Sequence, residues 1–248
     1  MYLIGDIGNT EIKICLFDKN YKVVKKLILK TNLISNKYLA LKLNFLKKYS
    51  LKINIILFSS VVPLVYSVIK KFLKKKLKLK CIELKQVNLN KLVKITVNKK
   101  QVGSDRISNA IGIIDKKSNY IILDFGTATT FDVIIKDKYL GGVIAPGVNL
   151  SLKTLTSKAS LIPPVKISKI SKIIGTNTST AVKAGFYWGY AGLIDNVIKL
   201  IIKQTNKRFK IILTGGLANL FKNTIKGKIE VKKDLTLNGL LKVAINLK

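Results

Sequence analysis

The sequence predicts an α/β protein of two related halves, each a mixed β-sheet with flanking helices. The first observation is a short turn that occurs twice, at Asp6–Thr10 and at Asp124–Thr130. The second is that each turn joins two apolar runs of strand length, as in a β-hairpin. The third is that both hairpins are followed by a further strand, a helix, a strand and a helix. A duplicated β-β-β-α-β-α unit accounts for all three observations.

The elements of the first half follow from its apolar runs and their spacing. Its expected strands after the hairpin are 26–30, 53–58 and 81–84, and its expected helices are 36–49, 63–77 and one that begins near Asp105. The apolar stretch 53–69 is slightly short for a membrane span and is interrupted by Pro63. A buried strand and a helix that begins at this proline explain the stretch better, so we expect no membrane association.

The second half repeats this order. Its expected strands after the hairpin are 139–140, 211–214 and 229–231, and its expected helices are 148–156, 179–203 and 235–245. We therefore expect one domain over residues 1–117, which holds the first turn and Gly103–Arg106. The second domain is expected over residues 118–248 and holds the second turn.

The chain is strongly basic: 46 Lys and Arg against 12 Asp and Glu give its 248 residues a formal net charge of +34. Such a charge ordinarily indicates nucleic acid or another anionic surface as a partner. Here the basic residues are almost all Lys and are spread along the chain, which favours a general drift in composition. We expect no specific nucleic-acid partner.

Cys15 and Cys81 lie in apolar runs without metal-ligand spacing, which indicates reduced thiols and a cytoplasmic protein.

The two turns combine the groups that bind phosphate. A strand that ends in Asp and reverses through Gly presents backbone N–H groups, hydroxyls and one carboxylate at a single point. Taken alone, Asp6–Thr10 could be only a tight hairpin in which Gly8 and Asn9 supply the turn. Its repetition at Asp124 favours a phosphate cradle in which the carboxylate holds Mg²⁺ through water. Because side chains alternate along a strand, Lys13 lies on one face of the next strand, from which it could reach a phosphate.

The segment Gly103-Ser104-Asp105-Arg106 is the second candidate for chemistry. It could be only the start of a helix, with Asp105 as its cap and Arg106 as a surface charge. Alternatively, Asp105 is a base towards a substrate hydroxyl and Arg106 clamps a substrate carboxylate. Arginine is rare in this chain, and its planar fork binds a carboxylate bidentately where lysine cannot. Because the chain has no His, a general base must be a carboxylate, Lys, Tyr or Cys.

Five motifs occur in the order and spacing of type III pantothenate kinases, which belong to the superfamily of actin-like ATPases and sugar kinases. They are D-I-G-N-T at 6–10, G-S-D-R at 103–106, D-F-G-T-A-T-T-F-D at 124–132, G-G-V-I-A-P-G at 141–147 and N-T-S-T-A at 177–181. The resemblance covers essentially the whole chain. It implies duplicated actin-like (ribonuclease H-like) domains and ATP-dependent phosphorylation of pantothenate, the first step towards coenzyme A.

The resemblance also implies a role for each motif residue. Asp105 would be the catalytic base, and pantothenate would be bound by Gly103, Ser104, Asp105, Arg106 and, from the partner subunit of a homodimer, Thr178. The phosphates of ATP would lie on Asp6, Gly8, Asn9, Thr10, Glu11, Lys13 and Thr127, with Mg²⁺ at Asp6 through water. Asp124 would bind a monovalent cation, K⁺ or NH₄⁺. A helix of the second half would form the dimer contact.

Two other functions remain open on the sequence. A family relative without kinase activity could act as an accessory factor in transcription, for which the high positive charge is the only support. A kinase for another small alcohol could share the fold. The presence of Asp6, Asp105, Arg106 and Asp124 argues against a relative without kinase activity.

Overall fold

The structure is a computed structural model that describes residues 1–247. The chain divides into two compact units. Unit one holds Met1–Ile114, Asp137–Tyr139 and the chain from Leu235 on, and unit two holds Asp115–Lys136 and Leu140–Asp234. The predicted domains 1–117 and 118–248 differ from these units mainly at the C-terminus, where the chain returns to unit one.

Unit one is built on a mixed sheet of five strands in the order β3-β2-β1-β4-β5. The strands are β1 (Tyr2–Ile7), β2 (Glu11–Phe17), β3 (Val23–Lys30), β4 (Ile55–Ser60) and β5 (Cys81–Glu83). The pairs β1–β2 and β2–β3 are antiparallel, whereas β4 is parallel to both β1 and β5. The C-terminal ends of β1, β4 and β5 therefore lie at one edge of the sheet.

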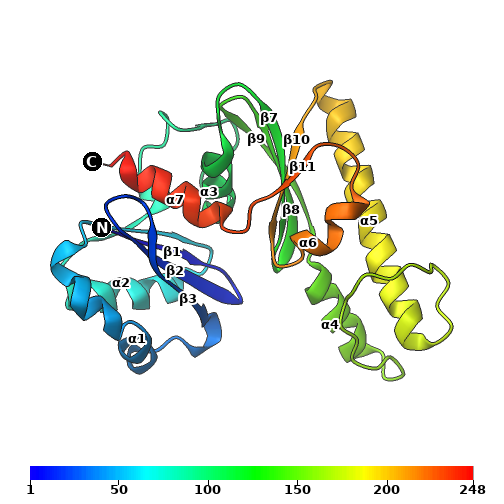
Figure 1. The fold of residues 1–248 in the computed structure, drawn as a ribbon, viewed down its shortest axis with the longest axis horizontal. Helices are drawn as coiled ribbons and strands as arrows, with labels where there is room; N and C mark the ends of the chain where they lie inside the picture. Colours follow the sequence, from blue (N-terminus) through cyan, green and yellow to red (C-terminus); the bar gives the residue numbers. More distant parts are fainter. Residues whose placement is uncertain (248) are drawn as a thin grey trace. The chain divides into compact units, whose positions relative to one another are not determined.

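Helices cover both faces of this sheet. Helices α1 (Asn36–Lys42) and α2 (Pro63–Leu77), with the 3₁₀ segment Asn44–Lys52 between them, pack on the face that carries Leu3, Ile7 and Phe58. Helices α3 (Ser104–Ile113) and α7 (Leu235–Ile245) contact β4, and α7 also contacts β1. Figure 1 shows α3 and α7 side by side. Short 3₁₀ turns occur at Thr31–Leu33 and Leu84–Gln86.

Contacts between α3 and α7 explain why the C-terminal segment belongs to unit one. Ser108 Oγ donates to the Thr236 carbonyl at 2.7 Å, and Thr236 Oγ1 donates to Asn109 Oδ1 at 2.8 Å. A Cβ on Gly112 would lie 2.8 Å from the carbonyl oxygen of Leu235, and one on Gly239 would overlap the carbonyl of Ser108. The two glycines thus allow the helices to approach closely, and a boundary drawn from strand and helix order alone misses this return of the chain.

Unit two is built on the strands β7 (Asn119–Phe125), β8 (Ala128–Ile135), β9 (Lys138–Pro146), β10 (Lys210–Gly215) and β11 (Ile229–Val231). Their order is β11-β10-β7-β8-β9, and β6 (Lys94–Ile95) of unit one pairs with the first residues of β9, which also belong to unit one. β7–β8 is antiparallel, whereas β10 is parallel to β7 and β11.

The helices of unit two are α4 (Val148–Lys158), α5 (Thr178–Thr205) and α6 (Ala218–Phe221), and a 3₁₀ turn follows at Lys222–Thr224. The long helix α5 lies along the sheet in Figure 1. Its buried residues Tyr187, Ile194 and Ile198 share one apolar core with Leu123 and Leu213 of the strands. Two mixed sheets with flanking helices confirm the predicted fold class.

Most predicted elements coincide with observed ones, and the differences have local causes. The expected helix 36–49 ends as an α-helix at Lys42, because Leu43 leaves the α conformation (φ −100°, ψ 17°) and a 3₁₀ segment follows. Strand β9 is longer than the expected 139–140. The apolar stretch 53–69 forms β4 and the start of α2, as predicted. Within residues 1–247, no helix has the length and apolarity needed to cross a membrane.

Candidate active site

Asp6 lies at the C-terminal edge of the unit-one sheet. In the strand register, Asp6 faces Lys13 on β2 and Ser59 on β4. Because side chains alternate along a strand, these three side chains share the face opposite Leu3 and Ile7, the face contacted by α3 and α7. The fully buried Ser59 donates its hydroxyl to Asp6 Oδ1 at 2.5 Å. The alternation of side chains thus places the Asp6 carboxylate, the Lys13 ammonium and the Ser59 hydroxyl on one face near the end of β1.

The turn after Asp6 is closed by its own backbone and tied to the next segment. Gly8 N–H donates to the Glu11 carbonyl at 3.0 Å. Thr31 Oγ1 donates to the Gly8 carbonyl at 2.8 Å, and Thr31 N–H donates to the Thr10 carbonyl at 3.0 Å. The side chains of Asn9, Thr10 and Glu11 are exposed. These hydrogen bonds fix the shape of the turn, and its polar side chains lie at the surface.

Helix α3 presents Asp105 in its first turn, with Gly103 as the N-cap. The Arg106 N–H donates to Asp105 Oδ1 at 2.8 Å. Burial raises the pKa of the Asp105 carboxyl, and the Arg106 N–H, the Arg106 guanidinium and the Lys85 ammonium oppose that rise. A carboxyl whose pKa is raised by burial at the start of a helix is a candidate for proton transfer.

The strand β4 joins Asp6 to the helix that carries Asp105. Ser104 Oγ donates to the Ser60 carbonyl and accepts from the Ser60 N–H, both at 2.9 Å. Ser59, the preceding residue, bonds to Asp6. The structure therefore brings the first turn and the Gly103–Arg106 motif together within unit one. Sequence reasoning missed both β4 serines, although two serines that end a strand beside Asp6 were a usable signal.

Hydrogen bonds to backbone carbonyl groups hold the segment that precedes Gly103. The N–H and Oγ1 of Thr96 both donate to the Tyr139 carbonyl, at 3.1 and 2.8 Å. Lys85 Nζ donates to the Lys100 carbonyl at 3.1 Å. Lys85 thereby links the chain after β5 to the residues that lead into α3.

Asp124 lies one residue before the end of strand β7 of unit two, beside Thr130 on β8 and Thr214 on β10. Gly215 has a positive φ of 85°, and a Cβ there would lie 2.6 Å from Asp124 Oδ1. The buried Oγ1 of Thr130 has no hydrogen-bond partner among the described residues. Glycine thus leaves room around the Asp124 carboxylate, and a hydroxyl oxygen beside it is available to a cation.

The remaining predicted residues of unit two lie on exposed segments. Thr127 is exposed in the β7–β8 turn, where a Cβ on Gly147 would overlap the carbonyl oxygen of Thr127. Thr178 is the exposed first residue of α5, and the Asn177 side chain caps this helix by accepting from Thr180 N–H at 2.9 Å. Asp124, Thr127 and Thr178 therefore belong to unit two, while the other predicted residues belong to unit one.

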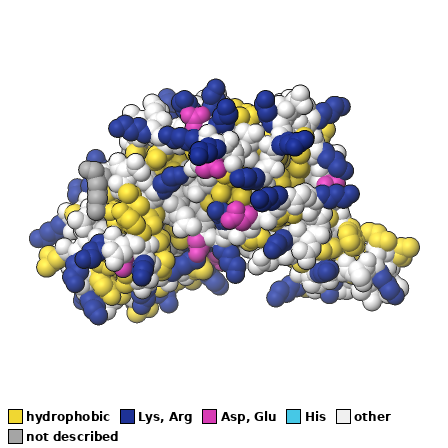
Figure 2. Space-filling view, turned by 45° about the horizontal axis from the view of Figure 1, so that its top comes forward, with side chains coloured by type: hydrophobic (Ala, Val, Ile, Leu, Met, Phe, Trp, Pro, Cys, Tyr) yellow, Lys and Arg dark blue, Asp and Glu magenta, His cyan; other side chains and the backbone are white. Residues whose placement is uncertain are grey.

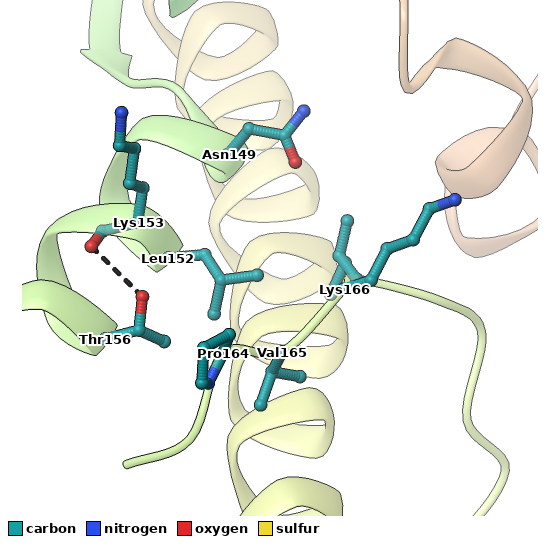
Figure 3. Close-up of a pocket in the computed structure, with 8 residues that line it drawn as sticks. Asn149, Leu152, Lys153, Thr156, Pro164, Val165 and Lys166 are labelled. Atoms are coloured by element: carbon teal, nitrogen blue, oxygen red, sulfur yellow. Dashed lines mark hydrogen bonds between the residues drawn. The ribbon is translucent and has the colours of Figure 1, made fainter.

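Neither the surface charge (Figure 2) nor the pocket in Figure 3 coincides with the predicted site residues. Figure 2 shows Lys and Arg spread over the face that it presents rather than gathered in one patch. The pocket in Figure 3 lies in unit two between α4 and the segment 164–167, and it contains none of the predicted residues. No group of three or more His, Cys, Asp or Glu in the described chain could hold a metal ion by itself. Mg²⁺ that keeps waters and binds substrate phosphates needs only one or two carboxylates.

Comparison with known proteins finds relatives along the whole chain. Residues 2–200 match the family described as type III pantothenate kinase. A type III pantothenate kinase of Pelagibacter ubique (strain HTCC1062) is 55% identical over 248 residues, which is 100% of both chains. One from Cereibacter sphaeroides (strain ATCC 17029) is 46% identical over 142 residues, 56% of this chain and 55% of that protein.

Solved structures share the fold at low identity. A Campylobacter jejuni protein assigned to the Baf family of transcriptional activators is 21% identical, with a TM-score of 0.64 over 99% of this chain and 98% of that chain. A ROK family glucokinase from Streptomyces griseus is 11% identical, with a TM-score of 0.55 over 98% of this chain and 99% of that chain. At these identities the likeness concerns the fold alone, and it supports the predicted sugar-kinase architecture.

Proposed function

The chain belongs to the type III pantothenate kinase family, and from that premise we propose which of its residues carry the reaction. The protein phosphorylates pantothenate with ATP, the first step of coenzyme A biosynthesis. A kinase of this family uses ATP together with a divalent metal ion. Phosphoryl transfer of this kind depends on positioning, charge neutralisation and a base for the alcohol.

We assign the base to Asp105. The observation that carries this assignment is its half-buried carboxyl in the first turn of α3, a turn that Ser104 bonds to β4, the strand next to Asp6. Its carboxylate accepts the hydroxyl proton of pantothenate as the hydroxyl oxygen bonds to the γ-phosphorus and ADP leaves. Because burial raises the pKa of the Asp105 carboxyl, its carboxylate is a stronger base than an exposed one.

We assign the pantothenate carboxylate to Arg106, with Gly103 and Ser104 shaping the same site. A guanidinium can bind a carboxylate through two parallel hydrogen bonds, whereas an ammonium acts as a point charge. Arg106 is half-buried and follows the base directly in α3, so it can hold the acid end of a substrate whose alcohol reaches Asp105.

We assign the phosphates of ATP to the turn of unit one. The turn is held by its own backbone hydrogen bond and carries exposed side chains, and Lys13 faces Asp6 across the hairpin. When bound, Mg²⁺ neutralises charge on the phosphates, and Asp6 would hold it through water. The proposed nucleotide-binding residues of unit one are Asp6, Gly8, Asn9, Thr10, Glu11 and Lys13, and the family resemblance adds Thr127 of unit two. Because a carboxylate repels a phosphate, Glu11 is suited to the metal ion that accompanies the phosphates rather than to a phosphate itself.

We place a monovalent cation, K⁺ or NH₄⁺, at Asp124. The support is the space that Gly215 leaves beside its carboxylate and the buried Thr130 hydroxyl next to it. Hydroxyl and carboxylate oxygens can coordinate K⁺ or accept hydrogen bonds from NH₄⁺.

We propose further that the protein works as a homodimer in which Thr178 contacts pantothenate in the partner's site. The exposed Thr178 begins α5, and Trp188 on the same helix is also exposed, with 37% of its surface accessible. Large apolar side chains at a surface are typical of protein contacts. A cytoplasmic location is proposed because the buried cysteines Cys15 and Cys81 are present as thiols rather than as a disulfide, which suits a reducing compartment.

Substrate analogues test the assignment of Arg106. Steady-state kinetics would compare pantothenate with the analogue in which an alcohol replaces the carboxylate, for the wild type and for Arg106→Lys. The substitution should raise the pantothenate KM by about 10-fold or more, leave the ATP KM nearly unchanged and barely affect the neutral analogue. Equal effects of Arg106→Lys on pantothenate and its neutral analogue, or on the KM values of pantothenate and ATP, would contradict binding of the carboxylate by Arg106. A wild type that turns over other alcohols better than pantothenate would contradict the substrate itself.

A further inference from the structure

The end of strand β4 bonds to both catalytic regions of unit one. Ser59 donates to Asp6 Oδ1 at 2.5 Å, and the backbone of Ser60 exchanges two hydrogen bonds of 2.9 Å with the Ser104 hydroxyl. Ser59 and Ser104 are both fully buried. Neither β4 serine is among the residues assigned above to ATP, pantothenate or a cation.

The Ser59 hydroxyl has a specific effect on Asp6. A short carboxylate side chain can rotate about two bonds, and a buried donor on one oxygen selects one orientation. Ser59 and Asp6 are neighbours across the parallel β1–β4 pair, so the strand register fixes where the donor stands. With Oδ1 held by Ser59, the direction of Oδ2 is fixed as well.

Resting on the role of Asp6 proposed above, we propose that Ser59 is a positioning residue that orients the Asp6 carboxylate towards the water shell of the nucleotide-bound metal ion. Partners that orient a metal-binding carboxylate commonly change metal affinity by about 10- to 100-fold when they are removed. The effect of Ser59 passes through Asp6, so it should vanish when Asp6 no longer carries a carboxylate.

Binding titrations with a non-hydrolysable ATP analogue, with and without Mg²⁺, test this proposal apart from turnover. In the wild type, Mg²⁺ should tighten binding of the analogue. Ser59→Ala should reduce that gain about 10-fold while leaving the metal-free affinity unchanged. Ser60→Ala is the matched control, because its side chain accepts only from Val62 N–H and its backbone still bonds to Ser104.

The pair Ser59→Thr and Ser59→Val separates the hydroxyl from the effect of side-chain volume. Threonine keeps the donor and should bind the Mg²⁺ complex as the wild type does, whereas the isosteric valine should behave like alanine. This pair decides the matter if Ser59→Ala does not fold. Steady-state kinetics should show a raised requirement for Mg²⁺ with an unchanged pantothenate KM.

A double-mutant cycle distinguishes failure of this proposal from failure of the Asp6 assignment. Ser59→Ala should add nothing in an Asp6→Asn background, because the group that it positions is gone. If Asp6→Asn loses the Mg²⁺-dependent gain and Ser59→Val keeps it, the role of Ser59 is overturned and that of Asp6 stands. If Asp6→Asn keeps the gain, both roles are overturned. Fully additive losses would also overturn the positioning role.

Discussion

A Cβ placed on Gly103 would overlap Oδ1 of Asp105, so the residue before Ser104 must be glycine for the carboxylate to keep its position. The φ of Gly103 is −58°, a value that any residue adopts, so backbone strain is not the reason. The carboxylate of Asp105, the proposed base, occupies the space that a side chain at position 103 would need. Gly103 therefore serves Asp105 as well as the substrate.

Gly103→Ala should lower kcat by roughly 10- to 100-fold with little change in the ATP KM, because the methyl group displaces the carboxylate by a fraction of an ångström. Steady-state kinetics with each substrate varied is the measurement. Gly192→Ala is a control for the loss of a glycine, because a Cβ at this position of α5 would meet open space and its φ is not positive. A kcat within about twofold of the wild type would show that Asp105 does not depend on this space.

Asp124→Asn should weaken or abolish activation by K⁺ or NH₄⁺. The amide keeps the size of the side chain but removes the charge beside Gly215 and the Thr130 hydroxyl. Activity in Na⁺ buffer titrated with K⁺ is the measurement, with Asp195→Asn as a control, since Asp195 pairs with Lys199 on the surface of α5. The same K⁺ response in wild type and Asp124→Asn would refute the assignment.

Two inactive variants should restore activity when mixed. Asp105 and Thr178 lie in different units of the chain, yet the proposed dimer brings Asp105 of one subunit and Thr178 of the other to one site. In a heterodimer of Asp105→Asn and Thr178→Ala, one site carries both changes and the other carries neither. Activity should therefore rise towards half that of the wild-type dimer within the heterodimer fraction. An active monomer in light scattering, or no recovery after confirmed subunit exchange, would defeat the shared site.

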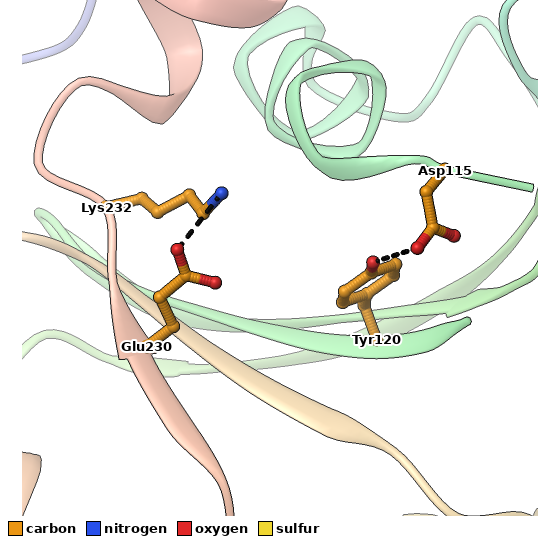
Figure 4. A network of polar contacts seen from close by, with 4 residues as sticks. All are labelled: Asp115, Tyr120, Glu230 and Lys232. Atoms are coloured by element: carbon orange, nitrogen blue, oxygen red, sulfur yellow. Dashed lines mark hydrogen bonds and ion pairs between the residues drawn. The ribbon is translucent and has the colours of Figure 1, made fainter. Parts of the chain in front are cut away.

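The Asp115 carboxylate should contribute to stability only above its folded pKa. It accepts from the N–H groups of Lys117 and Ser118 and from the hydroxyls of Ser118 and Tyr120, at 2.7 to 2.9 Å. Figure 4 shows the bond from Tyr120. The Ser118 N–H is the largest of the causes that lower the pKa of Asp115. Because the folded pKa is depressed, the stabilisation is full above the ordinary carboxyl pKa of about 4 and is lost as the pH falls below it.

Thermal midpoints of wild type and Asp115→Asn test that sign. The variant should melt below the wild type at pH 6, and the difference should shrink as the pH is lowered towards 3. Tyr120→Phe should show part of the same effect, since it removes one of the four donors. A difference that stays constant or widens in acid would contradict the prediction.

The sequence was sufficient for elements whose signal is local. The hairpins at Asp6 and Asp124 and the helix start at Pro63 follow from apolar runs, turn residues and a proline. The return of α7 to unit one was not predictable in this way, because it depends on close contact at Gly112 and Gly239 between segments far apart in the chain. The hydrogen bonds of Ser59 and Ser104 depend on strand register and side-chain rotamers, which residue spacing alone does not encode.

The turnover of Asp105→Asn, measured beside its affinity for a non-hydrolysable ATP analogue, tests the account most directly. The asparagine keeps the size of the side chain and cannot accept the hydroxyl proton of pantothenate as a base. We predict that kcat falls by about 10²- to 10⁴-fold while the affinity for the nucleotide remains within about twofold of the wild type. A folded variant that turns over pantothenate at the wild-type rate would contradict the assignment of Asp105 as the base.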